Sequence, residues 1–354
     1  MRAAVCHSHG GPEVVRVEDV PSPPGGAGPG KVRVRVGAAA VNFPDLLIIA
    51  GQYQITVPAP FVPGSEFAGV VTAVGAGVRE VSVGDPVMAT ALVGAFAEEA
   101  VVGAEAVRRI PSGVELSVAA AFGVAHRTAF HVLRSVAGLR RDEELVVLGA
   151  GGGVGLAAVQ LGHQLGASVT AVASSAEKLA AARSYGATHL VNHRSGPLRA
   201  ALRERLPGGA DVVVDPVGGG LSEPALRSLR WGGRFVTVGQ ASGTIARIPL
   251  NLVLLKGVQI LGFQLVDFAR HAPEEFRRNE DELMAMFGAR RVVPHIGNRF
   301  PLDQVAAALR CVADGAAVGK VVLDIADQRT WSGSGGPPAT SSERSNGPDR
   351  DHGA

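Results

Sequence analysis

A glycine-rich turn at residues 149–155 carries the pattern most closely tied to chemistry in this sequence. The apolar run Leu145–Leu148 precedes it, and apolar residues follow at helical spacing from Val154 to Leu165. A strand, a turn of small residues and a helix N-terminus, in that order, let backbone N–H groups bind a pyrophosphate. We therefore expect a phosphate-bearing cofactor here, with Ala150 in the place of the first glycine of G-x-G-x-x-G. The residues expected to contact it are Ala150, Gly152, Gly153, Val154 and Gly155.

The end of the next expected strand indicates which nucleotide the turn suits. NAD-binding units usually place an acidic residue there, where it binds the ribose 2′-OH. Here residues 168–173 form the expected strand, Ser174 and Ser175 follow it, and Lys178 lies just beyond, one helical turn in. Two hydroxyls and a cation suit a 2′-phosphate, so we predict NADPH as the cofactor. The alternative is that Ser174 caps the helix and Lys178 is a solvated surface residue.

Three further strand ends are candidates for the cofactor cleft, because ligands bind at the carboxyl ends of such sheets. His193 follows the third expected strand and offers a second basic group for the phosphate, although ordinary loop polarity explains it equally well. Val238 and Gly239 end the fifth strand, and Phe263 lies in the sixth. We expect these last three residues to line the nicotinamide half of the cleft.

A set of polar residues outside this region can act on a substrate. The Asn42 amide can donate to a developing oxyanion, and Asp45 can orient it or hold a water molecule. Thr128 and Tyr53 supply hydroxyls, and Tyr53 is either a proton donor or a loop aromatic packed over the cleft. Pro44 suits the first turn of a helix, which places Asn42 in the loop that enters it.

No metal site is expected. A catalytic zinc needs converging Cys, His or carboxylate ligands, but Cys6 and Cys311 lie outside the Asn42 loop and the turn at residues 63–66. His126 and His131 diverge on a helix; we expect His131 to be partly exposed and leave open whether His126 faces the cleft. The chemistry that remains is direct hydride transfer from a nicotinamide to an electrophilic carbon.

Composition narrows the class of protein. The 354 residues are 46% hydrophobic, enough for two domains, and 34 basic against 32 acidic residues give a net charge of +2, so no nucleic-acid partner is expected. Two isolated cysteines form no disulfide framework and suit a reducing cytoplasm. The N-terminus lacks a signal-peptide pattern and no apolar run reaches membrane-spanning length, so we expect a cytoplasmic protein without a membrane partner.

The elements that must position these groups follow from hydrophobic periodicity. Short alternating strands and many turns over roughly residues 1–116 indicate a mostly β domain. From residue 145 to about 264, strands and helices alternate, which indicates βαβ units and a parallel sheet. Residues 327–354 are rich in Ser, Gly, Pro, Asp and Arg, and we expect this tail to be disordered.

Several stretches, in this order and spacing, resemble the zinc-free quinone oxidoreductase branch of the medium-chain dehydrogenase/reductase family, the branch that includes zeta-crystallin. The resemblance spans about residues 1–325. The stretches that carry it are Ala40–Asp45, Gly51–Tyr53, Phe61–Glu66, Leu148–Gly155, Ala157–Gln160, Ala173–Lys178, Asp215–Gly219 and Gly319–Val322.

The resemblance implies an α/β fold with two domains and usually a homodimer. A Rossmann doubly wound parallel sheet at residues 123–266 would bind NADPH, and a mostly β GroES-like catalytic domain would comprise residues 1–122 and 267–326. Zinc-dependent relatives carry His where Ser65 stands and Cys in the Asn42 loop, and this chain has neither. The residue match gives substrate-site roles to Asn42, Asp45 and Thr128, and cofactor roles to Ser174, Ser175, Lys178, His193 and Lys320.

The function expected from these features is NADPH-dependent, zinc-independent hydride transfer to quinones or α,β-unsaturated carbonyl compounds. One alternative is an enoyl-thioester reductase, with an enoyl-CoA or enoyl-ACP substrate, built on the same fold. An alternative of another class is a non-enzymatic NADPH- or RNA-binding protein of the crystallin type. The polar set of Asn42, Asp45 and Thr128 favours catalysis over the last of these.

Overall fold

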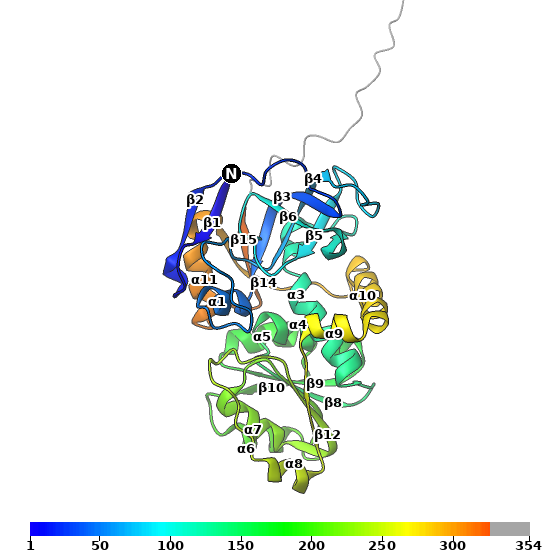
Figure 1. Cartoon of the computed structure of the whole chain (residues 1–354). Coiled ribbons are helices and arrows are strands. Elements are labelled where there is room, and N and C mark those ends of the chain that lie inside the picture. The colour runs from blue at the N-terminus through cyan, green and yellow to red at the C-terminus, as the bar shows by residue number, and fades with distance from the viewer. Residues whose placement is uncertain (326–354) are drawn as a thin grey trace, which may run out of the picture.

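The computed structural model describes residues 1–325, so the expected disordered tail at 327–354 lies outside the described residues. The chain forms two domains, one built on a parallel sheet and one on a mostly antiparallel sheet, with helices between them (Figure 1). Within residues 1–325, no helix is long and apolar enough to cross a membrane.

The predicted parallel sheet is confirmed. Six strands pair in the order β10-β9-β8-β11-β12-β13, and every pair is parallel. The order turns back at β8 and β11, so a crevice for a ligand opens beyond their carboxyl ends. Both central strands are almost wholly buried, which explains their continuous apolar runs. The six strands are β8 (Glu144–Leu148), β9 (Ser168–Ala173), β10 (His189–Asn192), β11 (Ala210–Asp215), β12 (Leu229–Thr237) and β13 (Gln259–Gly262).

Helices connect these strands and cover the sheet (Figure 1). In α4, residues such as Leu156 and Leu161 face the sheet and are buried, as the helical spacing predicts. The helices of this domain are α4 (Gly153–Gln164), α5 (Ala176–Ser184), α6 (Leu198–Arg205), α7 (Ser222–Leu226) and α8 (Leu250–Lys256).

The other domain contains a seven-stranded sheet in which the last strand of the described chain pairs with an early strand. β15 (Lys320–Asp324) pairs antiparallel with β3 (Lys31–Val41), so that Val321 lies opposite Val41. The C-terminal segment of the described chain therefore joins the domain formed by the N-terminal residues. It brings Lys320 next to the loop at Asn42. The other strands of this sheet are β4 (Glu66–Val74), β5 (Pro86–Thr90), β6 (Glu99–Gly103), β7 (Val107–Arg109) and β14 (Ile296–Pro301). A separate two-stranded sheet is formed by β1 (Arg2–Cys6) and β2 (Val15–Asp19).

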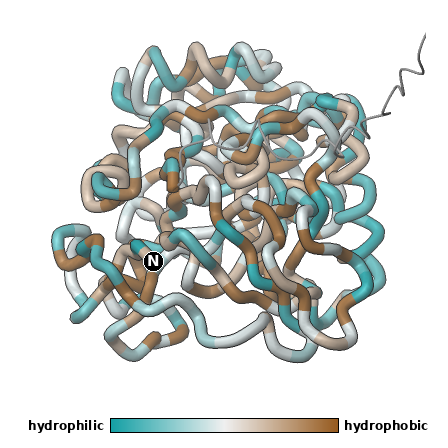
Figure 2. Tube along the Cα trace, turned by 90° about the horizontal axis from the view of Figure 1, so that it is seen from above, coloured by the Kyte–Doolittle hydropathy of each residue, from teal (hydrophilic) through white to brown (hydrophobic). Residues whose placement is uncertain are grey.

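Buried side chains from both domains meet in one continuous core. It joins Ala38 and Ala40 of β3 to Val147 of β8 through Phe122 and the helix that follows it. In Figure 2 the hydrophobic segments gather toward the middle of the trace and hydrophilic ones toward its outline. The helices that do not connect strands of the parallel sheet are α1 (Phe43–Ile49), α2 (Leu116–Ala120), α3 (Gly123–His131), α9 (Leu265–His271), α10 (Pro273–Gly288) and α11 (Val305–Ala313).

The glycine turn is tight because its backbone passes very close to the first turn of α4. Gly149 has φ of +61°, a left-handed conformation, so the residue that makes the sharp turn lies one position before Ala150. A Cβ on Gly155 would overlap the carbonyl oxygen of Gly149, which is backbone and cannot rotate away. Gly155 is therefore required for close packing of helix and strand.

Replacing Gly155 with alanine should destabilise the protein by about 1–3 kcal/mol, because the added methyl must displace backbone. The free energy of unfolding, measured by urea denaturation, tests this. Gly26→Ala is the matched control, since its methyl would enter open space in an exposed loop. Equal stability of the two variants would contradict the packing argument.

Candidate active site

The glycine turn presents the N-terminus of α4 to the crevice of the parallel sheet. Gly152 caps the helix in an extended conformation, and the helix begins at Gly153. The first N–H groups of a helix lack partners within it and carry its positive dipole end. The turn thus combines free donors with an absence of side chains, as a pyrophosphate requires.

The cap of the next helix differs from the alternative considered for Ser174. Ser175, not Ser174, caps α5: its hydroxyl accepts a hydrogen bond from the Lys178 N–H at 3.3 Å. Ser174 is the first residue after β9 and lies at the carboxyl end of the strand, because the chain needs one more extended residue before the helix begins.

Basic side chains gather beside these serines, at the ends of β9 and β10. Burial, followed by the charge of Arg194, lowers the pKa of both Lys178 and His193, and Lys178 also acts on His193. The structure therefore brings Lys178, His193 and Arg194 within electrostatic range of one another. We call these three residues the basic cluster.

Lys178 also contacts the other domain. Its side chain lies over Gly151, and its ammonium donates to the Gly315 carbonyl at 2.5 Å. The Gly319 N–H donates to the Gly151 carbonyl at 2.8 Å. The loop before β15 thus rests against the glycine turn, and Lys178 has to turn from Gly315 to reach a phosphate.

The residues predicted for the nicotinamide half follow neighbouring strand ends. Val238 comes directly after β12, and both it and Gly239 donate backbone N–H groups to the Asp215 carbonyl at the end of β11. Phe263 comes directly after β13 and its N–H donates to Thr237. The three are partly exposed at the same edge of the sheet, so their assignment to the cleft stays a prediction that the geometry permits.

The Asn42 loop forms a buried polar network instead of an open amide. Asn42 caps α1, and its backbone N–H donates to Asp45 Oδ2 at 2.7 Å. Its side-chain Nδ2 donates to Glu66 Oε1 at 2.9 Å and to Ser65 Oγ at 3.3 Å. Its Oδ1 accepts from the Lys320 ammonium at 2.6 Å. Both polar atoms of the amide are therefore held by protein partners, and its role as a donor to the substrate stays a prediction.

Lys320 lies in this network and not at a phosphate position. Its ammonium donates to Asn42 Oδ1, to Glu66 Oε1 at 2.7 Å and to the Val41 carbonyl at 3.2 Å. Three acceptors use all three of its N–H bonds. The stem of Lys320 lies beside Gly153 and its charge is directed to Glu66, so the contact of Lys320 with the cofactor stays a prediction. Glu66 itself was not identified from sequence, because its partners are distant in the chain.

Asp45 is a fully buried carboxyl group with an unusual affinity for protons. Burial raises its pKa to about 7, against the opposing effects of the Asn42 N–H, the Ser65 hydroxyl and the Lys320 charge. In the part of the chain that the structure describes, Asp45 Oδ1 has no hydrogen-bond partner. Asp45 orients the Asn42 backbone through the hydrogen bond from the Asn42 N–H and also holds a proton over part of the neutral range.

The two predicted hydroxyl donors lie on separate elements. Thr128 is mostly buried on α3, one turn after Val124, whose N–H donates to Glu66 Oε2 at 2.7 Å. Tyr53 is half-buried and packs against the core of the first domain. Neither hydroxyl has a hydrogen-bond partner within residues 1–325, and neither is joined to the Asn42 network.

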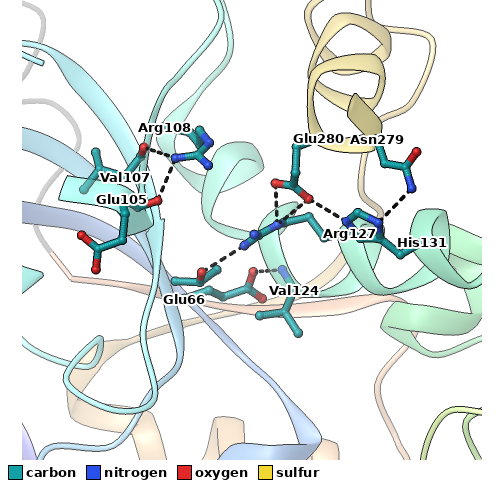
Figure 3. Close-up of polar contacts among 10 residues, drawn as sticks. Glu66, Glu105, Val107, Arg108, Val124, Arg127, His131, Asn279 and Glu280 are labelled. Carbon is teal, nitrogen blue, oxygen red and sulfur yellow. Dashed lines mark hydrogen bonds and ion pairs between the residues drawn. The ribbon is translucent and has the colours of Figure 1, made fainter. Parts of the chain in front are cut away.

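The expectation of a partly exposed His131 is wrong. His131 is completely buried between α3 and α10, with Nε2 3.0 Å from Glu280 Oε1 and Nδ1 3.1 Å from Asn279 Nδ2 (Figure 3). Arg127 also pairs with Glu280, at 2.8 Å, and donates to Thr90 Oγ1. α10 supplies these partners from about 150 positions away, which local periodicity on α3 cannot reveal.

His126, whose orientation the sequence does not predict, is also buried. Its Nε2 lies 3.2 Å from Gln160 Oε1 on α4, and its ring stacks on Phe122. Burial lowers the pKa of His126 to about 4, so it is neutral at physiological pH. His126 joins α3 to α4 behind the glycine turn.

The donor set around Asn42 does not suit a zinc ion. Within residues 1–325, no group of three or more His, Cys, Asp or Glu side chains is arranged to hold a metal. Asn42 Oδ1, Glu66 Oε1 and the Val41 carbonyl converge instead on the Lys320 ammonium. A bound cation there would have to displace a buried positive charge.

Known families match both domains. Residues 28–112 match the alcohol dehydrogenase GroES-like domain, and residues 153–286 match the domain described as zinc-binding dehydrogenase. Quinone oxidoreductase-like protein 2 from Bos taurus is 37% identical over 326 residues, which are 92% of each chain.

Solved structures agree with these matches. Mycobacterial Rv1454c complexed with NADPH superposes with a TM-score of 0.85 at 32% identity, and covers 92% of this chain and 100% of its own. Escherichia coli quinone oxidoreductase complexed with NADPH gives 0.84 at 27% identity with the same coverage.

The chain therefore belongs to the medium-chain dehydrogenase/reductase family, in its quinone oxidoreductase branch. It is an oxidoreductase of the quinone oxidoreductase type, with a Rossmann domain and a GroES-like domain.

The buried carboxyl group of Asp45 should make stability depend on pH. Its pKa of about 7 in the folded state exceeds the value of about 3.9 in an unfolded chain, so the folded state binds this proton more tightly. The contribution of Asp45 to the free energy of unfolding is thus present in acid and is lost as pH rises through about 7. Asp45→Asn, which keeps an oxygen acceptor for the Asn42 N–H, should lack this dependence.

Urea denaturation of both proteins between about pH 4.5 and about pH 8 measures the effect. The stability of the wild type relative to the variant should decline across this range. Parallel pH profiles would show that Asp45 titrates normally.

Proposed function

We propose that this protein is an NADPH-dependent, zinc-independent reductase that transfers hydride to quinones or α,β-unsaturated carbonyl compounds. The observation that carries the proposal is the basic cluster beside the glycine turn, at a strand end that has serines where NAD-specific proteins carry an acid. The NADPH complexes of two structural relatives support the same cofactor.

The residues present fit NADPH. The cradle at Gly149, Gly151 and Gly155 has no room for side chains, so the backbone can approach a pyrophosphate at the N-terminus of α4. The hydroxyls of Ser174 and Ser175 and the basic cluster would bind the 2′-phosphate, because cations and hydroxyl donors stabilise its charge. Val238, Gly239 and Phe263 would line the nicotinamide half.

Bound NADPH would supply the hydride for an electrophilic carbon of the substrate. The residues of the chain would bind and orient the substrate and donate a proton to its oxygen. The hydroxyls of Tyr53 and Thr128 have no hydrogen-bond partner among residues 1–325, so either can donate to the substrate oxygen. Asp45 holds a proton near neutral pH beside Asn42. The Lys320 charge at the Asn42 loop supports chemistry without zinc.

A screen of NADPH oxidation against 1,4-quinones, alkenals and enoyl-CoA tests the proposal. We expect turnover with a quinone or an alkenal in protein shown by elemental analysis to contain no stoichiometric zinc. Turnover with enoyl-CoA alone would favour the enoyl-thioester alternative. Binding of NADPH without turnover of any acceptor would refute the enzymatic function and favour a binding protein.

Lys178→Ala should weaken NADPH binding by about tenfold or more and leave NADH binding nearly unchanged, because only NADPH carries the 2′-phosphate. Dissociation constants from nicotinamide fluorescence measure both. Lys31→Ala is the matched control, since Lys31 is exposed in the other domain. Equal losses for the two nucleotides would refute the phosphate assignment.

We further propose that the protein is a homodimer in the cytoplasm, formed through the β13 edge of the parallel sheet. β13 is the last strand of its sheet in the described chain, and an open edge can pair with a second copy. Large apolar side chains surround this edge: Trp231 is 84% exposed, and Leu250 and Leu254 of α8 are 78% and 81% exposed. Such an exposed patch suits an interface.

Leu254→Glu should convert the dimer to a monomer, because the charge would be buried between the two copies. Light scattering coupled to size-exclusion chromatography gives the mass. Leu92→Glu, which changes an exposed leucine of the other domain, should leave the dimer intact. A dimeric Leu254→Glu protein would place the interface elsewhere.

A further inference from the structure

A single residue, Lys320, touches both the cofactor turn and the Asn42 loop. Its stem lies against the first residue of α4: a Cβ on Gly153 would lie 2.8 Å from Lys320 Cδ. The preceding residue, Gly319, is hydrogen-bonded to Gly151. The ammonium then reaches Asn42 and Glu66 in the other domain. The position of the amide relative to the cofactor turn therefore depends on this side chain.

The environment of the ammonium makes it a fixed charge. Lys320 is 4% exposed and Glu66 is 1% exposed, so water does not compete for either. A buried ion pair is stable only when its geometry is good and its remaining donors are hydrogen-bonded. Here the Val41 carbonyl, Asn42 Oδ1 and Glu66 Oε1 accept the N–H groups of the ammonium. No N–H of Lys320 is left for a substrate or a phosphate.

The network extends to α3 through Glu66. One carboxylate oxygen binds Lys320 and Asn42, and the other accepts the Val124 N–H at 2.7 Å in the first turn of α3. α3 carries Thr128 one turn later. Lys320 thereby ties the elements that carry Asn42 and Thr128 to the glycine turn.

We propose that Lys320 is a positioning residue for hydride transfer, which fixes the Asn42 side chain relative to the cofactor turn by supplying a permanent cation where zinc-dependent relatives hold their metal. This inference rests on the proposed reductase function. On this proposal, Lys320 affects the rate of hydride transfer and does not affect the affinity for NADPH. It also gives a physical reason for a site without zinc: the cation is part of the chain.

The test uses the double variant Lys320→Met/Glu66→Gln in the full chain. Lys320→Met alone leaves a buried unpaired carboxylate and is expected to lose stability, whereas Glu66→Gln removes that charge and retains an oxygen for the Val124 N–H. The control pair is Arg299→Met/Asp324→Asn, which removes a partly exposed ion pair from the neighbouring strands β14 and β15.

Three quantities are measured: the side-chain amide resonances of Asn42 in the free protein, the NADPH dissociation constant, and kcat with the acceptor identified by the screen. The Asn42 resonances are assigned by their loss in Asn42→Asp. In the double variant we expect shifted Asn42 resonances, NADPH affinity close to wild type, and kcat lowered by about tenfold or more, which is at least about 1.4 kcal/mol in the barrier. The control pair should change none of the three.

A folded double variant with wild-type kcat would overturn the proposal and leave Lys320–Glu66 as a structural ion pair. A loss of NADPH affinity as large as the loss of kcat would overturn it in favour of a phosphate ligand. Absence of turnover in the wild type would refute the proposed function separately. In that case unchanged Asn42 resonances in the double variant would still refute the positioning role, and shifted ones would support it.

Discussion

The ammonium of Lys320 lies in the interior of the protein, where an unpaired charge costs several kcal/mol. Its neutralisation by Glu66 requires that β15, the last strand of the described chain, pairs with β3 and begins at the glycine turn. This one requirement holds the C-terminal strand, the Asn42 loop and the N-terminus of α4 together. The remainder of the site is arranged around these three points.

The proposed cofactor and substrate halves of the site are built from different parts of the chain. The cofactor half is made from backbone: a helix N-terminus, close glycine packing and neighbouring strand ends, with the basic cluster added at one side. The proposed substrate half is made from side chains whose positions depend on distant partners, such as Asn42 with Glu66. Affinity for the nucleotide and choice of substrate can therefore vary independently in this fold.

Local patterns could be predicted from the sequence, whereas contacts between distant residues could not. Alternating strands and helices, the glycine turn and the absence of an acid after β9 are local patterns, and the parallel sheet they predict is present. The exposure of His131 was predicted wrongly and the ion pair of Lys320 with Glu66 was not foreseen, because each depends on a residue about 150 or more positions away. The cap at Ser175 differed from the expected one by a single residue, which is the usual precision of a helix boundary.

In the proposed reaction, hydride passes directly from the nicotinamide to a carbon of the substrate without the help of a metal ion. Reduction of an α,β-unsaturated carbonyl compound with NADPH deuterated at C4, followed by mass spectrometry and NMR of the product, tests it most directly. We expect one deuterium at the β-carbon of the product, transferred from the cofactor, in protein free of zinc. Product without cofactor-derived deuterium, or activity that appears only when zinc is added, would contradict it.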